Sequence, residues 1–248
     1  MSFTVAKFGG TSVADYPSML RCAQIVKNNP SIRLVVVSAC AGVTNRLAEI
    51  ADKQGKQTES LRNEIYTIHA SIQQKLKSSG ALELSLSQLH DELESHCQKA
   101  IANWAAWRDE LLSFGERCSS LLFSCVLNEQ GLLSDTLDAR QLLKTNSVFG
   151  RAQPDEVSTK SHCLEQKQKL DSGCVWVTQG FIGSDDKTQT TTLGRGGSDY
   201  SAALLAAGFN ATDLQIWTDV AGIYTTDPRI CSSARAIAEM SFSEAAEL

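Results

Sequence analysis

The segment TVAKFGG, residues 4–10, decides the fold, because an apolar run rich in strand-forming residues ends there at a pair of glycines. Asp15, just ahead of Pro17, is a typical helix start and predicts a helix over Pro17–Asn28. The run Leu34–Ser38 is apolar and β-branched, as in a strand buried on both faces of a parallel sheet. Strand, helix and strand together predict a βαβ unit.

Strands and helices alternate in the same way through the second half of the chain. The expected segments are, in order, a helix from Phe114 to about Asn128, a strand near Ser134–Leu137, a helix at Pro154–Leu170, a strand at Cys174–Gln179, a hairpin at Gly183–Thr192, a helix at Ser198–Ala207 and a strand at Leu214–Thr218. We therefore predict an α/β fold, a three-layer αβα sandwich with an open, mainly parallel sheet. Ligands of such sheets bind beyond the carboxyl ends of the strands.

Residues from about 56 to 112 differ in composition, with few β-branched residues and with leucines three or four positions apart. This pattern predicts two or three amphipathic helices. Because no Pro/Gly linker flanks them, we interpret them as a helical insertion within one domain over residues 1–248. Trp104 and Trp107 are expected to be packing residues.

The composition excludes several classes of protein. The chain has 248 residues, a formal net charge of −5 and a pI near 5.4, which argues against nucleic acid or an anionic membrane as partner. Its eight cysteines form no CxxC pair and no close His/Cys cluster, so no zinc site is expected. The N-terminus is not a signal peptide and no apolar run is long enough to cross a bilayer. We expect a cytoplasmic protein.

Four segments that follow predicted strands carry groups suited to ligand binding. The first, KFGGTS at 7–12, places Lys7 at the end of a strand, ahead of Gly9 and Gly10. Glycines let backbone N–H groups approach a phosphate and the lysine supplies a cation, although a tight turn beside a solvated lysine is an equal alternative. No GxxxxGK[ST] motif is present, so this is not a Walker-type loop.

Two further segments are rich in hydroxyl groups. SACAGVTN, at 38–45, leaves room for a ligand against the backbone, and its Thr44 can donate to a carboxylate oxygen. An ordinary strand-to-helix loop explains the same residues. WTDVAGIYTTDPR, at 217–229, mixes hydroxyls, an aromatic ring, two carboxylates and an arginine. That set can hold an adenine, a ribose and a triphosphate, and a surface Ω-loop is the alternative.

The remaining segment, TTLGRGGSDY at 191–200, surrounds Arg195 with three glycines. The planar guanidinium suits bidentate capture of a carboxylate. Ser198 is placed to cap the following helix, and Asp199 either complements the helix dipole or orients a lysine or a metal-bound phosphate. Outside these segments, Glu116 is expected to open an apolar helix, where it either complements the dipole or binds a substrate ammonium group.

Together, KFGGTSV, SACAGVTN, TTTLGRGGSDYSAALLA and WTDVAGIYTTDPR resemble the motifs of aspartate kinases, in order and along the whole chain. The single-activity, lysine-sensitive type is the most similar. The resemblance implies the amino-acid-kinase fold, with a mainly parallel sheet of about eight strands. It also implies transfer of the γ-phosphate of ATP to the β-carboxylate of L-aspartate, which gives 4-phospho-L-aspartate and begins the route to lysine, threonine and methionine.

The resemblance further implies roles for the residues that match these motifs. The expected catalytic residues are Lys7, which neutralises charge on the transferred phosphoryl group, and Asp199. The expected aspartate-binding residues are Ser38, Thr44, Glu116, Arg195 and Ser198. The expected ATP-binding residues are Gly9, Gly10, Thr11, Thr218, Asp219, Tyr224 and Arg229. ATP and Mg²⁺ are the expected cofactors, with no residue assigned as a metal ligand.

The chain stops at SFSEAAEL, residues 241–248, where the family continues into a lysine-bearing KVLHP-like segment and two regulatory ACT domains. We therefore expect a fragment of a longer protein, with reduced activity, and a homo-oligomer in the full-length parent. One alternative is a fragment that binds nucleotide or aspartate with little turnover. Others are a glutamate or acetylglutamate kinase, or a kinase domain cut from a fused aspartate kinase–homoserine dehydrogenase.

Overall fold

The structure of the chain, a computed structural model, describes residues 3–77, 80–170, 173–218, 222–228, 230–241 and 243–244. They fall into two compact units, Met1–Trp217 and Thr218–Leu248. The first unit holds the main sheet and its helices, and within the second Tyr224 and Ala236 form an isolated antiparallel bridge. In the described part of the chain, no helix is both long enough and apolar enough to span a membrane.

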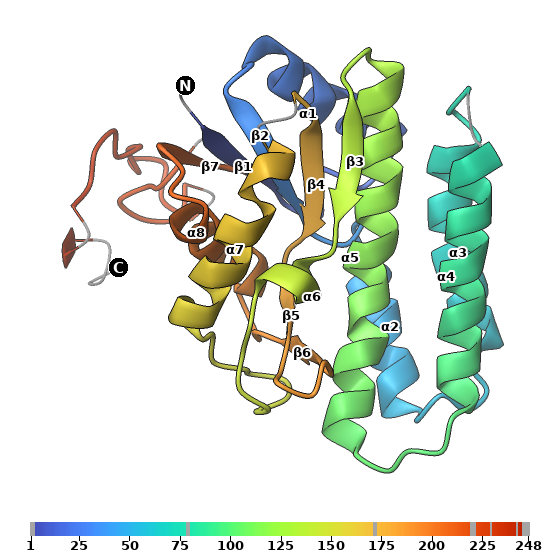
Figure 1. Cartoon of the computed structure of the whole chain (residues 1–248). Coiled ribbons are helices and arrows are strands. Elements are labelled where there is room, and N and C mark those ends of the chain that lie inside the picture. Colours follow the sequence, from blue (N-terminus) through green and yellow to red (C-terminus); the bar gives the residue numbers. More distant parts are fainter. Residues whose placement is uncertain are drawn as a thin grey trace. The chain divides into compact units, whose positions relative to one another are not determined.

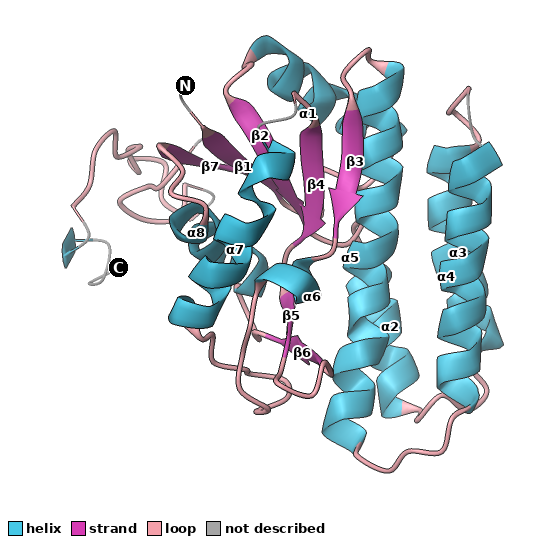
Figure 2. Cartoon of the chain, in the orientation of Figure 1, coloured by secondary structure: helices cyan, strands magenta, loops and turns pink. Residues whose placement is uncertain are grey.

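Five parallel strands form the main sheet (Figure 2). In chain order they are β1 (Thr4–Phe8), β2 (Ile32–Val37), β3 (Ser134–Leu137), β4 (Val175–Gln179) and β7 (Asp213–Trp217). Their order across the sheet is β3-β4-β2-β1-β7, and every pairing is parallel. The predicted open, parallel sheet is confirmed, although the described residues give it five strands instead of about eight.

The predicted hairpin lies beside the main sheet as a separate two-stranded antiparallel sheet. It consists of β5 (Ile182–Ser184) and β6 (Thr190–Thr192), with Ile182 opposite Thr192. Because β6 ends at Thr192, the hairpin leads directly into the glycine-rich segment around Arg195. The hairpin therefore determines where that segment starts.

Helices cover both faces of the sheet, and the alternation of side chains along β1 shows the two cores. Ala6 and Phe8 belong to a large apolar cluster with α1 (Tyr16–Asn28), α2 (Val43–Asp52) and α5 (Trp104–Glu129). Val5 belongs to a second cluster with α7 (Glu156–Leu170) and α8 (Gly197–Gly208). Full burial of each such side chain contributes about 1.5–3 kcal/mol. The three-layer sandwich is thus confirmed (Figure 1).

The helical insertion is built differently from the prediction. It contains α3 (Glu59–Gln73) and α4 (Gly80–Gln98), but its last helix, α5, continues without a break from Trp104 into the sheet-covering layer. The expected boundary near residue 112 therefore lies inside a helix, because nothing between Asn103, which caps α5, and Glu129 stops it. Trp107 is buried as expected, whereas the side chain of Trp104 is 45% exposed and is not a core residue.

Of the two helix starts predicted at Asp15 and Ser198, the first is confirmed and the second is wrong. Asp15 caps α1, as expected, and accepts a hydrogen bond of 2.8 Å from the backbone N–H of Ser18. Ser198 does not cap α8, because that position is taken by Gly196 with φ of 75°. Gly42, with φ of 84°, starts α2 in the same way. Neither glycine offers a side-chain cap, and the first N–H of each helix closes a turn instead, from Gly197 to the carbonyl of Gly194 and from Val43 to the carbonyl of Cys40, both at 3.0 Å. The sequence analysis did not predict α2 or the short α6 (Ala139–Leu142).

Candidate functional site

The loops that follow the parallel strands meet at one edge of the sheet, because all five strands end there (Figure 1). The N–H of Ser38, just after β2, donates to the carbonyl of Phe8 at 3.2 Å, immediately before Gly9. The N–H of Gly180, just after β4, donates to the carbonyl of Val37 at 2.9 Å. These bonds bring the loops after β1, β2 and β4 together, as predicted for a ligand site.

Lys7 reaches this edge from β1 and forms an ion pair there. Its Nζ lies 2.6 Å from Oδ1 of Asp199, in the first turn of α8. The Lys7 side chain is only 9% exposed, whereas that of Asp199 is 51% exposed. Because a buried ammonium group is unfavourable without a counter-ion, the pair fixes Nζ at the start of α8. Of the alternatives given for Asp199, orientation of a lysine is the one that this contact supports.

The two glycines after β1 allow this loop to approach its neighbour. A Cβ on Gly10 would lie 2.9 Å from the carbonyl oxygen of Ala39, so a side chain does not fit there. A Cβ on Gly9 would lie 3.5 Å from Nζ of Lys7. The N–H of Ser12 closes a turn on the carbonyl of Gly9 at 3.0 Å, and Thr11 is exposed on that turn. The turn therefore lies against the loop after β2, next to the ammonium group.

Glu116 lies in the interior of α5 and is 3% exposed, so the expectation that it opens a helix is wrong. Its Oε1 accepts a hydrogen bond of 3.1 Å from the N–H of Ala39, and Oε2 has no partner among the described residues. Burial raises the pKa of Glu116 to about 8, although the bond from Ala39 acts in the opposite direction. A buried carboxyl group with one free oxygen is suited to an incoming cation. Because Glu116 is not in the first turn of α5, the alternative that it complements the helix dipole is wrong.

Arg195 and Ser198 enter the same edge from the loop between β6 and α8. A Cβ on Gly180 would lie 2.8 Å from Cβ of Ser198, so Ser198 packs directly against the end of β4. Arg195 is exposed and makes no ion pair or hydrogen bond within the described ranges. Gly194 and Gly196, on either side of it, have φ of 80° and 75°. These left-handed positions require glycine and turn the backbone around a free guanidinium group.

Ser38 and Thr44 lie on the loop after β2 that also carries Ala39. Ser38 is half-buried at the strand end, and Thr44 is exposed in the first turn of α2. The hydrogen bond from the N–H of Ala39 therefore joins the carboxyl group of Glu116 to the residue that follows Ser38. Of the nucleotide residues, Thr218 is exposed and Tyr224 half-buried in the second unit. Asp219 and Arg229 lie outside the described residues.

Known proteins share the sequence and the fold of this chain. Residues 2–248 match the amino acid kinase family. The chain belongs to the amino acid kinase family. It is 45% identical over 248 residues to lysine-sensitive aspartokinase 3 of Escherichia coli (strain K12), covering 98% of the chain and 55% of that protein. It is 38% identical over 245 residues to an aspartokinase of Chlamydia pneumoniae, covering 98% and 53%.

A solved structure agrees with these relatives. E. coli aspartokinase III in complex with aspartate and ADP matches this chain with a TM-score of 0.94 at 43% identity, covering 99% of the chain and 56% of the other. The resemblance to aspartate kinases inferred from the motifs is confirmed. The chain spans about half the length of the relatives it matches.

Sequence reasoning missed Asp109, which holds the start of the glycine-rich segment in place. The carboxylate is fully buried in α5, where Oδ2 accepts from the N–H groups of Gly150 and Thr192, both at 2.8 Å. Its Oδ1 accepts from Oγ1 of Thr192 at 2.9 Å. Burial raises the pKa of Asp109 in spite of these bonds. An acidic residue on an amphipathic helix gives no sequence signal for this role, since most are solvated.

Phe181, also missed, follows the carboxyl end of β4. Its φ of 70° is unusual for an aromatic residue. Its N–H donates to Oγ of Ser201 at 2.8 Å, and its carbonyl accepts from Leu193 at 3.0 Å. These bonds join the loop after β4 to both ends of the glycine-rich segment. Its place directly after a predicted strand was a signal that could have marked it.

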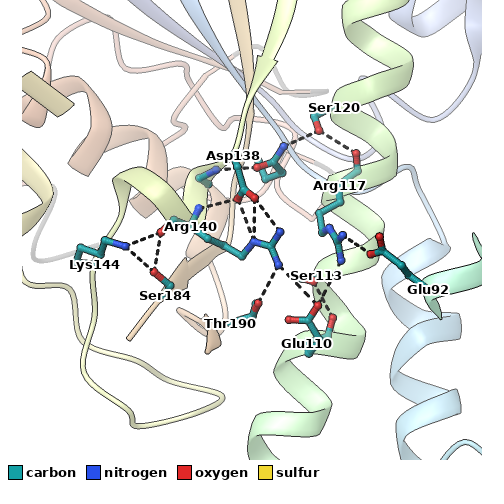
Figure 3. Close-up of polar contacts among 12 residues, drawn as sticks. Glu92, Glu110, Ser113, Arg117, Ser120, Asp138, Arg140, Lys144, Ser184 and Thr190 are labelled. Carbon is teal, nitrogen blue, oxygen red and sulfur yellow. Dashed lines mark hydrogen bonds and ion pairs between the residues drawn. The ribbon is translucent and has the colours of Figure 1, made fainter. Parts of the chain in front are cut away.

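A polar network supports the edge on the side of β3 (Figure 3). Arg140 Nη2 lies 2.8 Å from Oδ2 of Asp138, at the end of β3, and Arg117 Nη2 lies 2.6 Å from Oε2 of Glu92. Glu110 lies between the two arginines, 3.3 Å from Arg117 and 3.7 Å from Arg140. Burial acts to raise the pKa of Asp138, but the bonds from Arg140 outweigh it and lower the pKa. The network ties α4 and α5 to this end of the sheet.

Proposed function

We propose that this chain is the substrate- and nucleotide-binding part of an aspartate kinase, which transfers the γ-phosphate of ATP to the β-carboxylate of L-aspartate and forms 4-phospho-L-aspartate. The observation that carries the proposal is the meeting of the Lys7–Asp199 pair with the glycine turn at the carboxyl edge of a parallel sheet. The likeness to an aspartokinase bound to aspartate and ADP supports the choice of substrates.

The proposed amino-acid site has charges of both signs. Glu116 offers a free carboxyl oxygen to the substrate ammonium group, and Arg195 offers a free guanidinium group to the α-carboxylate. A zwitterion needs both partners. We assign to Ser38, Thr44 and Ser198 the hydrogen bonds that hold the rest of the substrate. The substrate ammonium group would also lower the pKa of Glu116, so binding favours the ionised carboxylate.

The proposed nucleotide site begins at Lys7. Its ammonium group and the backbone N–H groups of the loop at Gly9, Gly10 and Thr11 suit the phosphates of ATP. That Thr218, Asp219, Tyr224 and Arg229 bind the nucleotide stays a prediction from the sequence motif. Lys7 and Asp199 are the proposed catalytic residues.

The residues fit a magnesium ion that arrives with ATP. Asp199 uses Oδ1 to contact Lys7, and as an exposed carboxylate it keeps a second oxygen for a cation. Mg²⁺ commonly takes one or two carboxylates together with phosphate oxygens and water. When bound, the ion would neutralise charge on the β- and γ-phosphates.

Chemically, this chain would work by positioning and positive charge. The β-carboxylate of aspartate is already ionised at neutral pH, so no general base is required. Lys7 would offset the repulsion between the two anionic reactants, and Arg195 with Glu116 would align the nucleophile with the phosphorus atom. Orientation of bound reactants contributes up to about 7–11 kcal/mol in favourable cases.

A hydroxamate assay for acyl phosphate tests the reaction on this chain. We expect hydroxamate to form with ATP, Mg²⁺ and L-aspartate, and not when L-glutamate or N-acetylglutamate replaces aspartate. Signal with one of those substrates alone would identify another amino-acid kinase. Calorimetric binding of aspartate without turnover would select the binding-fragment alternative, provided that turnover appears when the C-terminal portion of a relative is added. A cytoplasmic location and a homo-oligomeric parent stay predictions.

A further inference from the structure

A cluster of side chains that could bind a metal ion lies between α3, α4 and α5. His69, His90 and Cys118 come one from each helix, and one ligand atom of each lies within 4.8 Å of those of the other two. The sequence analysis expected no such cluster, because these residues are far apart in the chain. The packing of the three helices brings them together. All eight cysteines are free thiols, and Cys118 is among the buried ones.

The imidazole rings of His69 and His90 lie against each other, and a hydrogen bond between them satisfies only some of their nitrogen atoms. Nδ1 of His69 lies 3.1 Å from Nε2 of His90, with the rings 5.4 Å apart and nearly parallel. Two such nitrogens share either one proton or one metal ion. Nε2 of His69, a residue 1% exposed, has no partner among the described residues. The pair is therefore incompletely satisfied as a purely structural contact.

The three side chains have the chemistry of ligands for a cation. A neutral imidazole ring has one nitrogen lone pair to donate, and a thiol binds a metal ion as its thiolate. Cys118 is buried, so the positive charge of a bound ion would offset the cost of a thiolate there.

We propose that His69, His90 and Cys118 bind one soft monovalent cation, Cu(I), in a three-coordinate site. Thiolate and imidazole are ligands that Cu(I) accepts. One positive charge on one thiolate leaves the buried group neutral, whereas Zn²⁺ would leave a net charge in an apolar interior. Zn²⁺ also prefers four ligands, and the described residues bring no fourth His, Cys or carboxylate into the group. Binding releases the thiol proton to solvent and involves no change of oxidation state.

The residues around the cluster leave His90 partly accessible to an ion and hold its ring in place. His90 is half-buried, which gives the ion a path from solvent. Tyr66 stacks on His90 with ring centroids 4.0 Å apart and donates its hydroxyl to the His90 carbonyl at 3.1 Å. Bonds of about 2.0–2.3 Å from a closed-shell ion to nitrogen and sulfur require ligand atoms roughly 3.3–3.8 Å apart, so small side-chain rotations close the site.

The test is an anaerobic competition for Cu(I) between the reduced protein and the chromophoric chelator bathocuproine disulfonate. We expect one Cu(I) per chain and, by X-ray absorption, one sulfur and two nitrogen neighbours. Cys118→Ser and His69→Gln should each weaken binding by more than about 100-fold. The controls Cys125→Ser, on the same helix, and His162→Gln, on α7, should bind as the parent does.

Several results would overturn the proposal. They are an unchanged chelator spectrum, uptake of Zn²⁺ but not of Cu(I), and equal loss of binding in Cys125→Ser. Loss in Cys40→Ser with retention in His69→Gln would place the ion on the neighbouring thiols instead. Should the Cys118 variant misfold by circular dichroism, His90→Gln, at the half-buried position, tests the same site. A melting temperature that rises with Cu(I) only when all three ligands are present gives independent support.

Discussion

Lys7 and Glu116 are both buried ionisable residues at the carboxyl edge of the sheet, but they differ in their interaction partners. Lys7 has a counter-ion, Asp199, at 2.6 Å. Glu116 has a single hydrogen bond from Ala39 and one oxygen without a partner among the described residues. The cation is therefore compensated within the protein, whereas the acid is not.

This difference suggests how the two halves of the proposed site prepare for their ligands. The ammonium group of Lys7 is held in place by its ion pair with Asp199, whose exposed side chain leaves room for a phosphate. The carboxyl group of Glu116, with a pKa near 8, is mostly protonated at neutral pH in the free protein. It gains a full negative charge only when a cation reaches it. The half of the proposed site around Lys7 is therefore preorganised, whereas the half around Glu116 becomes charged only when its substrate binds.

Removal of the paired cation should have the largest effect. We expect Lys7→Ala to lower kcat by about 10²–10³-fold or more, because the charge on the transferred phosphoryl group loses its nearest protein cation. The measurement is steady-state kinetics by the hydroxamate assay, with circular dichroism to confirm folding. Lys53→Ala, which removes an exposed lysine paired with Glu49, is the control. Near-normal turnover in a folded Lys7 variant would remove Lys7 from the mechanism.

We expect the ionisation of Glu116 to make the free energy of unfolding depend on pH. The pKa of Glu116 is raised from 4.5 to about 8 in the folded chain, so unfolding releases a proton between those values. The free energy of unfolding should therefore fall as the pH rises from about 4.5 to about 8, by several kcal/mol. Urea titrations across this range measure the slope.

Glu116→Gln is the matched variant for that slope, because it keeps an acceptor for Ala39 but cannot ionise. We expect the variant to lose most of the decline in stability with pH. A variant with the same slope as the parent would assign the titration to another group. Aspartate itself should release protons on binding at pH 7, which calorimetry in buffers of different ionisation enthalpy detects.

The sequence analysis predicted the surroundings of Lys7 better than those of Glu116. Lys7 at a strand end before two glycines was a local signal, and its partner Asp199 was foreseen as a residue that could orient a lysine. Strand positions followed from apolar runs, and Ser134–Leu137 was predicted with the bounds that the structure shows. Local patterns of this kind depend on neighbouring residues, so a single sequence contains them.

The environment of Glu116 depends on contacts between distant segments, so the sequence did not show it. The expected helix began at Phe114, which made Glu116 a first-turn residue, whereas α5 begins at Trp104 and buries it. The same applies to Asp109, whose three hydrogen bonds cross from α5 to the hairpin region. Ser198 was misjudged as a cap because a left-handed glycine was not anticipated there.

Arg195 extends the comparison, because its guanidinium group has no partner among the residues that the structure describes. We expect Arg195→Ala to raise KM for aspartate about 10–100-fold and to change KM for ATP little, because the lost contact is with the α-carboxylate. Initial rates with each substrate varied in turn measure both constants. Arg33→Ala, on β2, serves as the control. An effect confined to ATP would move Arg195 from the amino-acid half of the site to the nucleotide half.

The smallest expected effect concerns the contact between the two halves, where Gly10 meets Ala39. A Cβ at Gly10 would lie 2.9 Å from the Ala39 carbonyl, so Gly10→Ala must push apart the turn beside Lys7 and the loop that binds Glu116. We expect a loss of about 1–3 kcal/mol in the free energy of unfolding. Gly80→Ala, at a helix position with no atom within 4 Å, should leave stability nearly unchanged. If both substitutions have equal effects in urea titrations, the two loops are not tightly packed, and Lys7 and Glu116 are positioned independently of each other.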